Sequence, residues 1–141
     1  MKTALTVSRY LLGAALFVFG LNGFLHFIPQ PSPPEAGGAF LGALAGAGVL
    51  PVVKAFEVVI GALLLLGRWV PLALVMLVPI SVNIVLYHLV FAPAGGVPAY
   101  AVAALNAFLI WGYRQHLLPL LRRDARPLAP APAPRAGLAT A

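Results

Sequence analysis

Residues 51–91 read PVVKAFEVVIGALLLLGRWVPLALVMLVPISVNIVLYHLVF and contain two long apolar runs, 51–66 and 69–91. A helix rises about 1.5 Å per residue, and the hydrocarbon core of a bilayer is roughly 30 Å thick. Gly67 and Arg68 separate the runs and leave room for only a tight turn. The stretch therefore predicts two antiparallel membrane-spanning helices, with Pro79 inside the second as the expected site of a kink.

Composition supports a membrane protein along the whole chain. Of the 141 residues, 62% are hydrophobic and only 9% are charged, which is too little charge to cover the surface of a soluble domain. The sequence contains no cysteine. This excludes disulfide exchange, thiolate nucleophiles, iron–sulfur clusters and cysteine zinc sites, and with them a quinone-linked disulfide oxidase.

Two further spans lie on either side of this stretch. The first covers residues 10–28 and has no small-residue cleavage site at its end, so we expect a retained helix rather than a signal peptide. The other covers residues 98–114 and continues as an interfacial turn to Leu121. Glycines at 13, 20 and 61 provide small surfaces for close helix packing.

The segments between and after the spans are short or rich in proline. Residues 29–34 hold four prolines and are predicted to form an extended loop. Residues 40–50 are too few to cross a bilayer, which favours a re-entrant or interfacial helix. Residues 122–141 are rich in proline and alanine and are predicted to be a disordered tail. The fold class is thus all-α: a four-transmembrane-helix, up-down-up-down bundle formed by residues 1–121.

Positive charges predict the orientation. With four spans, one side of the membrane carries Lys2, Arg9, Arg68, Arg114, Arg122, Arg123, Arg126 and Arg135, whereas the other side carries Lys54 alone. The positive-inside rule then places both termini in the cytoplasm. Because these residues flank apolar segments, the net charge of +6 is explained by orientation and not by nucleic-acid binding.

Polar side chains within the spans gather at one depth, in the outer half of the bundle. The candidate ligand-binding residues at this level are Asn22, His26, Lys54, Glu57, Asn83, Tyr87, His88 and, nearer the middle, Asn106. Ionisable groups in a membrane are costly and are expected to face the interior of a bundle and to pair. This convergence predicts a site for a small molecule.

Glu57 is the candidate catalytic residue, as a group that binds or relays a proton. It is the only acid within a predicted span, and Lys54, three residues earlier, would favour its charged form. The alternative is structural: Lys54 extends to the outer interface, and Glu57 and the asparagines only join helices by hydrogen bonds.

Three histidines need separate interpretation. His26 and His88 could ligate a haem or a metal from two helices, but hydrogen bonding or proton relay is favoured, and no metal site is predicted. His116 lies beside Arg114 at the cytoplasmic boundary and needs no special role.

Taken in order, these segments resemble the DoxX family of small bacterial membrane proteins. The resemblance rests on RYLLGAALFVFGLNGFLHFIPQP, on GVLPVVKAFEVVIGALLLLGRWVPLAL after the Gly/Ala segment, and on PISVNIVLYHL, and it covers residues 9 to about 118. It implies a four-helix bundle in the bacterial inner membrane and a broad association with redox chemistry. It supports the fold better than any one reaction.

Together these observations predict a redox-associated subunit or accessory of a membrane oxidoreductase, not a catalyst that acts alone. Its ligand would be a quinone or a similar lipid-soluble molecule. Its expected partners are the lipid bilayer, oxidoreductase subunits and further copies of itself, and no nucleic acid. The alternative is a non-enzymatic scaffold or transport-assisting protein in which the polar cluster serves helix assembly.

Overall fold

A computed structural model describes residues 1–29 and 32–121, and all regular structure in this part of the chain is helical. The elements are α1 (Lys2–Leu25), α2 (Glu35–Gly46), α3 (Val49–Leu66), α4 (Val70–Phe91), η1 (Pro93–Gly95), α5 (Val97–Gly112), α6 (Arg114–Leu117) and η2 (Leu118–Leu121). The predicted all-α class is confirmed. The predicted disordered tail, residues 122–141, lies outside the described residues.

Three helices are long and apolar enough to cross a membrane: α1 with 24 residues, α3 with 18 and α4 with 22. Large apolar side chains remain exposed along them, among them Phe19, Val59 and Val82. Such surface is costly in water but favourable against lipid tails. These helices therefore indicate a membrane protein. The fourth apolar helix, α5, has 16 residues and is shorter than the others.

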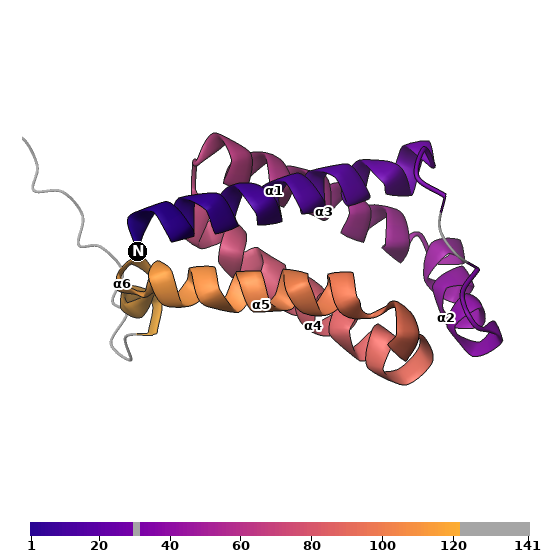
Figure 1. Cartoon of the computed structure of the whole chain (residues 1–141). Coiled ribbons are helices and arrows are strands. Elements are labelled where there is room, and N and C mark those ends of the chain that lie inside the picture. The colour runs from indigo at the N-terminus through magenta and orange to yellow at the C-terminus, as the bar shows by residue number, and fades with distance from the viewer. Residues whose placement is uncertain (30–31, 122–141) are drawn as a thin grey trace, which may run out of the picture.

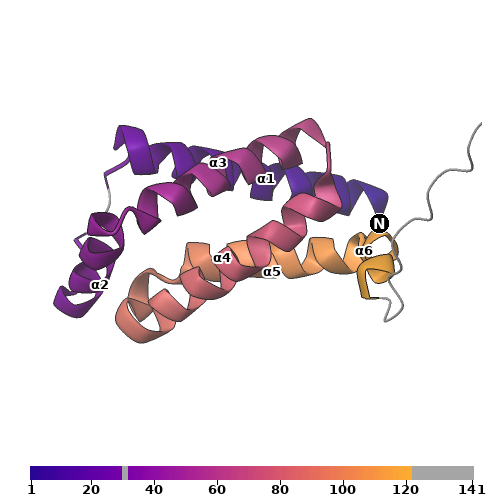
Figure 2. The same cartoon turned by 180° about the vertical axis from the view of Figure 1, so that it is seen from behind.

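The long helices form two pairs (Figures 1 and 2). α1 lies along α3, and α4 lies along α5, while α2 crosses one end of the molecule. We call this the α2 end. The start of α1, the turn from α3 to α4, and α6 lie together at the opposite end, which we call the α6 end.

Buried apolar side chains are concentrated toward the α6 end. The core consists of Leu12, Leu16, Ile60, Leu64, Val70, Ala73, Leu74, Leu77 and Leu109, drawn from all four long helices. α1 and α3 approach closely here, because a Cβ atom placed on Gly61 would lie 2.6 Å from the backbone nitrogen of Phe17. The predicted role of glycine in close packing is confirmed at this position.

Several predicted boundaries were wrong by a few residues. α1 begins at Lys2 and ends at Leu25 instead of covering residues 10–28. α2 covers Glu35–Gly46 rather than 40–50, since Pro34 adopts an extended conformation at its N-cap and Glu35 suits the positive end of the helix dipole. α4 begins at Val70, within one residue of the prediction, after Gly67 and Trp69 turn the chain with positive φ angles of 67° and 51°.

Candidate functional site

Lys54 and Glu57 form an ion pair in the first half of α3. The Lys54 Nζ donates to both carboxylate oxygens of Glu57, at 3.0 and 2.8 Å. Their spacing of three residues places both on one face of the helix. Glu57 is only 3% exposed, whereas the side chain of Lys54 is 25% exposed. The carboxylate is therefore enclosed by protein, and its cationic partner forms the accessible side of the pair.

Two glycines of α1 make room for this ion pair. A Cβ atom on Gly23 would lie 2.5 Å from Cγ and 2.6 Å from Cδ of Lys54. A Cβ atom on Gly20 would lie 3.0 Å from the Cβ of Glu57. The aliphatic stem of Lys54 and the base of Glu57 thus lie directly against the backbone of α1.

Asn22 closes the C-terminal end of α1, two residues beyond Gly20. Its Nδ2 donates to the carbonyl of Ile28 at 3.1 Å, and its Oδ1 accepts from the Ile28 amide at 2.6 Å. His26 follows the helix with a φ of 51°, and its side chain is exposed. The His26 amide still donates to the Asn22 carbonyl at 3.0 Å, but Asn22 is buried and the His26 side chain is exposed, so the two side chains form no common contact.

An aromatic group joins α2 to the end of α4. Phe40 of α2 stacks on Tyr87 and Phe91, with ring centroids 6.2 and 5.5 Å away, and the Tyr87 ring meets His88 edge-on at 5.2 Å. His88 Nδ1 lies 2.8 Å from the carbonyl of Ile84 in its own helix. Tyr87 therefore belongs to the packing of α2 against α4, whereas the contacts of His88 lie within α4.

Asn83 also bonds within its own helix. It is exposed, and its Nδ2 donates to the carbonyl of Pro79, one turn earlier, at 2.9 Å. A hydrogen bond of this kind satisfies a side chain locally and connects no second helix.

Asn106 and Ser81 form a buried polar pair between α5 and α4. Asn106 is 3% exposed and Ser81 is 5% exposed, and the Asn106 Nδ2 donates to the Ser81 Oγ at 3.4 Å. The Oδ1 of Asn106 has no hydrogen-bond partner among the described residues. Both residues line a surface groove of about 360 Å³ whose other walls are apolar: Val78, Val82, Val85, Leu86, Ala103, Ala107 and Ile110.

The predicted site residues thus fall into separate groups instead of one convergent cluster. Lys54 and Glu57 are paired within α3 and lie against α1, Tyr87 belongs to the α2–α4 contact with His88 beside it, and Asn106 lies between α4 and α5. No side-chain hydrogen bond in the described part of the chain links these groups. The same part contains no cluster of three or more metal-binding side chains.

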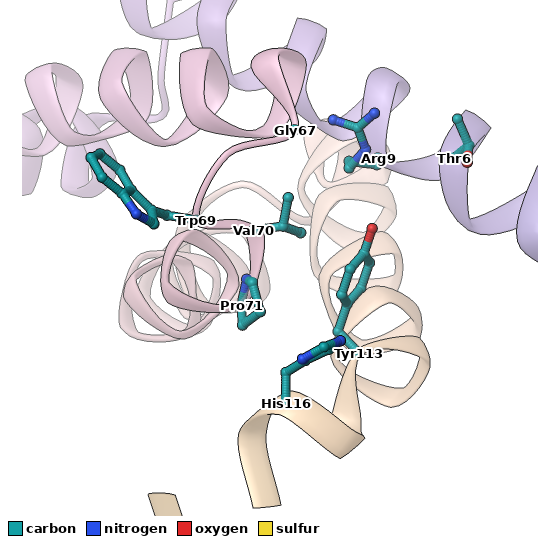
Figure 3. A pocket seen from close by; sticks show the side chains of 8 residues that line it. All are labelled: Thr6, Arg9, Gly67, Trp69, Val70, Pro71, Tyr113 and His116. Atoms are coloured by element: carbon teal, nitrogen blue, oxygen red, sulfur yellow. The ribbon is translucent and has the colours of Figure 1, made fainter. Parts of the chain in front are cut away.

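A second pocket, at the α6 end, was not anticipated from the sequence (Figure 3). It has a volume of about 350 Å³ and is lined by Thr6, Arg9, Gly67, Trp69, Val70, Pro71, Tyr113 and His116. Sequence reasoning assigned Arg9 only to orientation and His116 to no role. The available indication was the position of Arg9, directly before the apolar run of the first span and three residues after Thr6, on the same helix face.

No protein-family model, curated protein or solved structure matches the chain. The resemblance to the DoxX family therefore stays a prediction made from the residues that carry it.

Proposed function

We propose that the chain is a DoxX-like protein of the bacterial inner membrane, with four spans and cytoplasmic termini. Support comes from the three long apolar helices and from the continuation of α5 into α6 and η2, which together reach Leu121. Lys2, Arg9, Arg68 and Arg114 lie in the start of α1, in the turn from α3 to α4 and in α6, all at the α6 end, whereas Lys54 lies in the first third of α3, which starts near the α2 end. This distribution favours a cytoplasmic α6 end.

The proposed orientation can be tested by cysteine labelling, because the natural chain has no cysteine. In right-side-out spheroplasts, a Gly95→Cys variant in η1 should react with a membrane-impermeant maleimide. A Gln115→Cys variant in α6 should react only after the membrane is permeabilised. The reverse pattern, or labelling of both positions from outside, would contradict the proposed topology.

For the activity, we propose that the protein serves a membrane oxidoreductase by binding a quinone or a similar lipid-soluble molecule, with Glu57 handling a proton. The observation that carries this proposal is the burial of the Glu57 carboxylate. It lies on an apolar helix of a membrane protein and is paired with Lys54. Burying an ion pair in a membrane gives little net stability, so such pairs most often serve a function.

The ion pair is suited to exchange a proton with a ligand. A quinone gains two electrons and two protons on reduction; a partner subunit would supply the electrons. Glu57 would hold or pass a proton, and the partly exposed ammonium of Lys54 would be the first group that a ligand oxygen meets. The ammonium has three N–H donors, so it can donate to a ligand carbonyl oxygen while it stays hydrogen-bonded to both carboxylate oxygens of Glu57.

The groove between α4 and α5 offers a second contact for a ligand of this kind. Its apolar walls suit an isoprenoid or acyl tail, and its two polar residues, Ser81 and Asn106, lie at its base. The unpartnered Oδ1 of Asn106 could accept a hydrogen bond from a hydroxyl group, as a quinol would provide.

Native mass spectrometry with a charge-neutral variant tests the site. Glu57→Gln should weaken the binding of a short-chain ubiquinone analogue by about tenfold or more, since hydrogen bonds to charged groups are the stronger ones. Glu35→Gln is the matched control, because Glu35 is an exposed acid on α2 and undergoes the same change. Circular dichroism would establish that both variants fold.

Two results would contradict this proposal. A wild-type protein that retains no quinone from its own membrane and binds none of the analogue lacks the site. If a folded Glu57→Gln variant binds the analogue as tightly as the wild type, Glu57 takes no part in binding.

The alternative function, a non-enzymatic scaffold, is favoured by one specific observation. Asn22, Asn83 and His88 each bond to backbone groups close to them in sequence. Polar residues used in this way shape or end helices and recognise no ligand. Co-purification of protein partners by a chain that carries no quinone would support the scaffold.

A further inference from the structure

The pocket at the α6 end is lined by polar and aromatic side chains from the start of α1, the turn between α3 and α4, and the end of α5 with α6. Thr6 and His116 are exposed at its rim, Tyr113 is half-buried, and Arg9 is 9% exposed. Figure 3 shows the hydroxyl end of Tyr113 directed toward Arg9, with the ring of His116 on the other side of Tyr113.

Arg9 is a buried cation without a carboxylate partner among the described residues. The one ion pair in that part of the chain joins Lys54 to Glu57. The Arg9 Nη1 donates to the backbone carbonyl of Leu64 near the end of α3, and the guanidinium lies 4.4 Å from the centre of the Tyr10 ring. Its nitrogens also lie against Gly67, since a Cβ there would be 2.9 Å from Nη1.

These contacts neutralise Arg9 only in part. A guanidinium has five N–H donors, and one hydrogen bond to Leu64 leaves most of them available. The C-terminus of a helix contributes about half of a negative charge, and an aromatic ring contributes less. A full negative charge in the pocket would complete the neutralisation.

The surroundings select the kind of anion. Trp69 is 67% exposed and Trp111 is 49% exposed, as expected for side chains at the level of lipid headgroups. Arg68 and Arg114 lie at the same end, each close to one of these tryptophans. An arginine fork beside a tyrosine hydroxyl and an imidazole matches the oxygens of a phosphate group.

We propose that this pocket binds a phosphate group through Arg9, Tyr113 and His116, as a site separate from Glu57. The group belongs either to an anionic phospholipid of the surrounding leaflet or to a soluble phosphate compound. Arg9 supplies the charge and a forked pair of donors, while Tyr113 and His116 supply hydrogen bonds from the opposite wall.

The lipid arm of the test compares phosphatidylglycerol with phosphatidylcholine, both presented to the full chain in mixed micelles and measured by native mass spectrometry. The phosphate arm titrates inorganic phosphate into lipid-free detergent protein by calorimetry. Retention of phosphatidylglycerol over phosphatidylcholine identifies the lipid as the source, and binding in the second arm identifies a soluble phosphate. No preference in the first arm and no binding in the second overturn the proposal.

Variants assign the binding to the pocket. Arg9→Gln should weaken the binding about tenfold or more, and Tyr113→Phe and His116→Ala should each weaken it several-fold. Arg114→Gln is the matched control, because it removes one exposed positive charge at the same end and lies outside the pocket lining. Equal losses in Arg9→Gln and Arg114→Gln would reduce the effect to general surface charge and overturn the proposal.

The Tyr113→Phe and His116→Ala variants keep the test decisive even if the Arg9→Gln variant does not fold. Arg9 bonds to the end of α3, so Arg9→Gln could fail to fold for structural reasons. Neither Tyr113 nor His116 makes a side-chain hydrogen bond within residues 1–29 and 32–121, so Tyr113→Phe and His116→Ala remove none there. If both fold and bind as tightly as the wild type, the proposed site is wrong whatever Arg9→Gln does.

Discussion

Replacing Lys54 by methionine is expected to lower the free energy of unfolding by about 3–5 kcal/mol. The substitution keeps an unbranched side chain across Gly23 as far as the ε position but removes the charge that accompanies Glu57. A carboxylate that is 3% exposed would then remain in the protein interior without a partner. The measurement is an unfolding titration in mixed micelles with increasing SDS, followed by circular dichroism.

A double variant provides the control for this expectation. Lys54→Met combined with Glu57→Leu removes both charges, and replacement of a whole buried pair by apolar residues is often neutral or stabilising. The double variant should therefore regain most of the stability that Lys54→Met loses. If the single and double variants are equally unstable, the loss comes from packing around Lys54 and not from an unpaired carboxylate.

Gly61→Ala is the second change with a large expected effect, a loss of about 3 kcal/mol. The new Cβ would lie 2.6 Å from the Phe17 nitrogen and 2.8 Å from the Gly13 carbonyl oxygen, both backbone atoms of α1. A backbone cannot move aside as the end of a flexible side chain can, so α1 and α3 would have to separate. The same SDS titration measures this loss.

Gly42→Ala is the matched control for Gly61→Ala. Gly42 lies inside α2, and no heavy atom lies within 4 Å of a Cβ placed there. Alanine has the higher helix propensity, so this variant should gain roughly 0.5–1 kcal/mol. A Gly61→Ala variant as stable as the wild type would show that α1 and α3 lie further apart than described.

Most of the helices could be predicted from hydropathy and from the positions of glycine and proline between the apolar runs. α4 was predicted within one residue, because the turn at Gly67 and Arg68 and the apolar run after it are both unambiguous. The end of α1 was not, because it depends on the Asn22 side chain, which bonds to a residue that sequence alone places inside the helix. Hydropathy does not contain that information.

The candidate site was predicted only in part. The pairing of Lys54 with Glu57 follows from helical spacing and was correct. No hydrogen bond in the described part of the chain joins the other predicted site residues to this pair, because a polar side chain in an apolar helix can bond to the carbonyl one turn earlier, as Asn83 and His88 do. Depth can be inferred from a sequence, but the choice between a local carbonyl and a second helix depends on rotamers and packing.

The burial of Arg9 was not predicted from the sequence. Its positive charge was explained by the orientation of the protein in the membrane alone, so its contacts with Leu64 and Gly67 were not expected. Whether a basic residue near the start of a membrane helix extends to the headgroups or turns inward depends on which helix ends lie beside it. The tertiary fold decides which helix ends these are.

The uneven placement of the core has a consequence for how the molecule opens. Its buried leucines and Ile60 lie toward the α6 end, while the α2 end is joined by the rings of Phe40, Tyr87 and Phe91. Moving α2 away from α4 would break this aromatic contact and leave the leucine packing intact. Partial opening therefore costs far less than unfolding. The α2 end is therefore expected to open more easily than the α6 end, and a molecule from the lipid could enter at the α2 end while the packing at the α6 end stays intact.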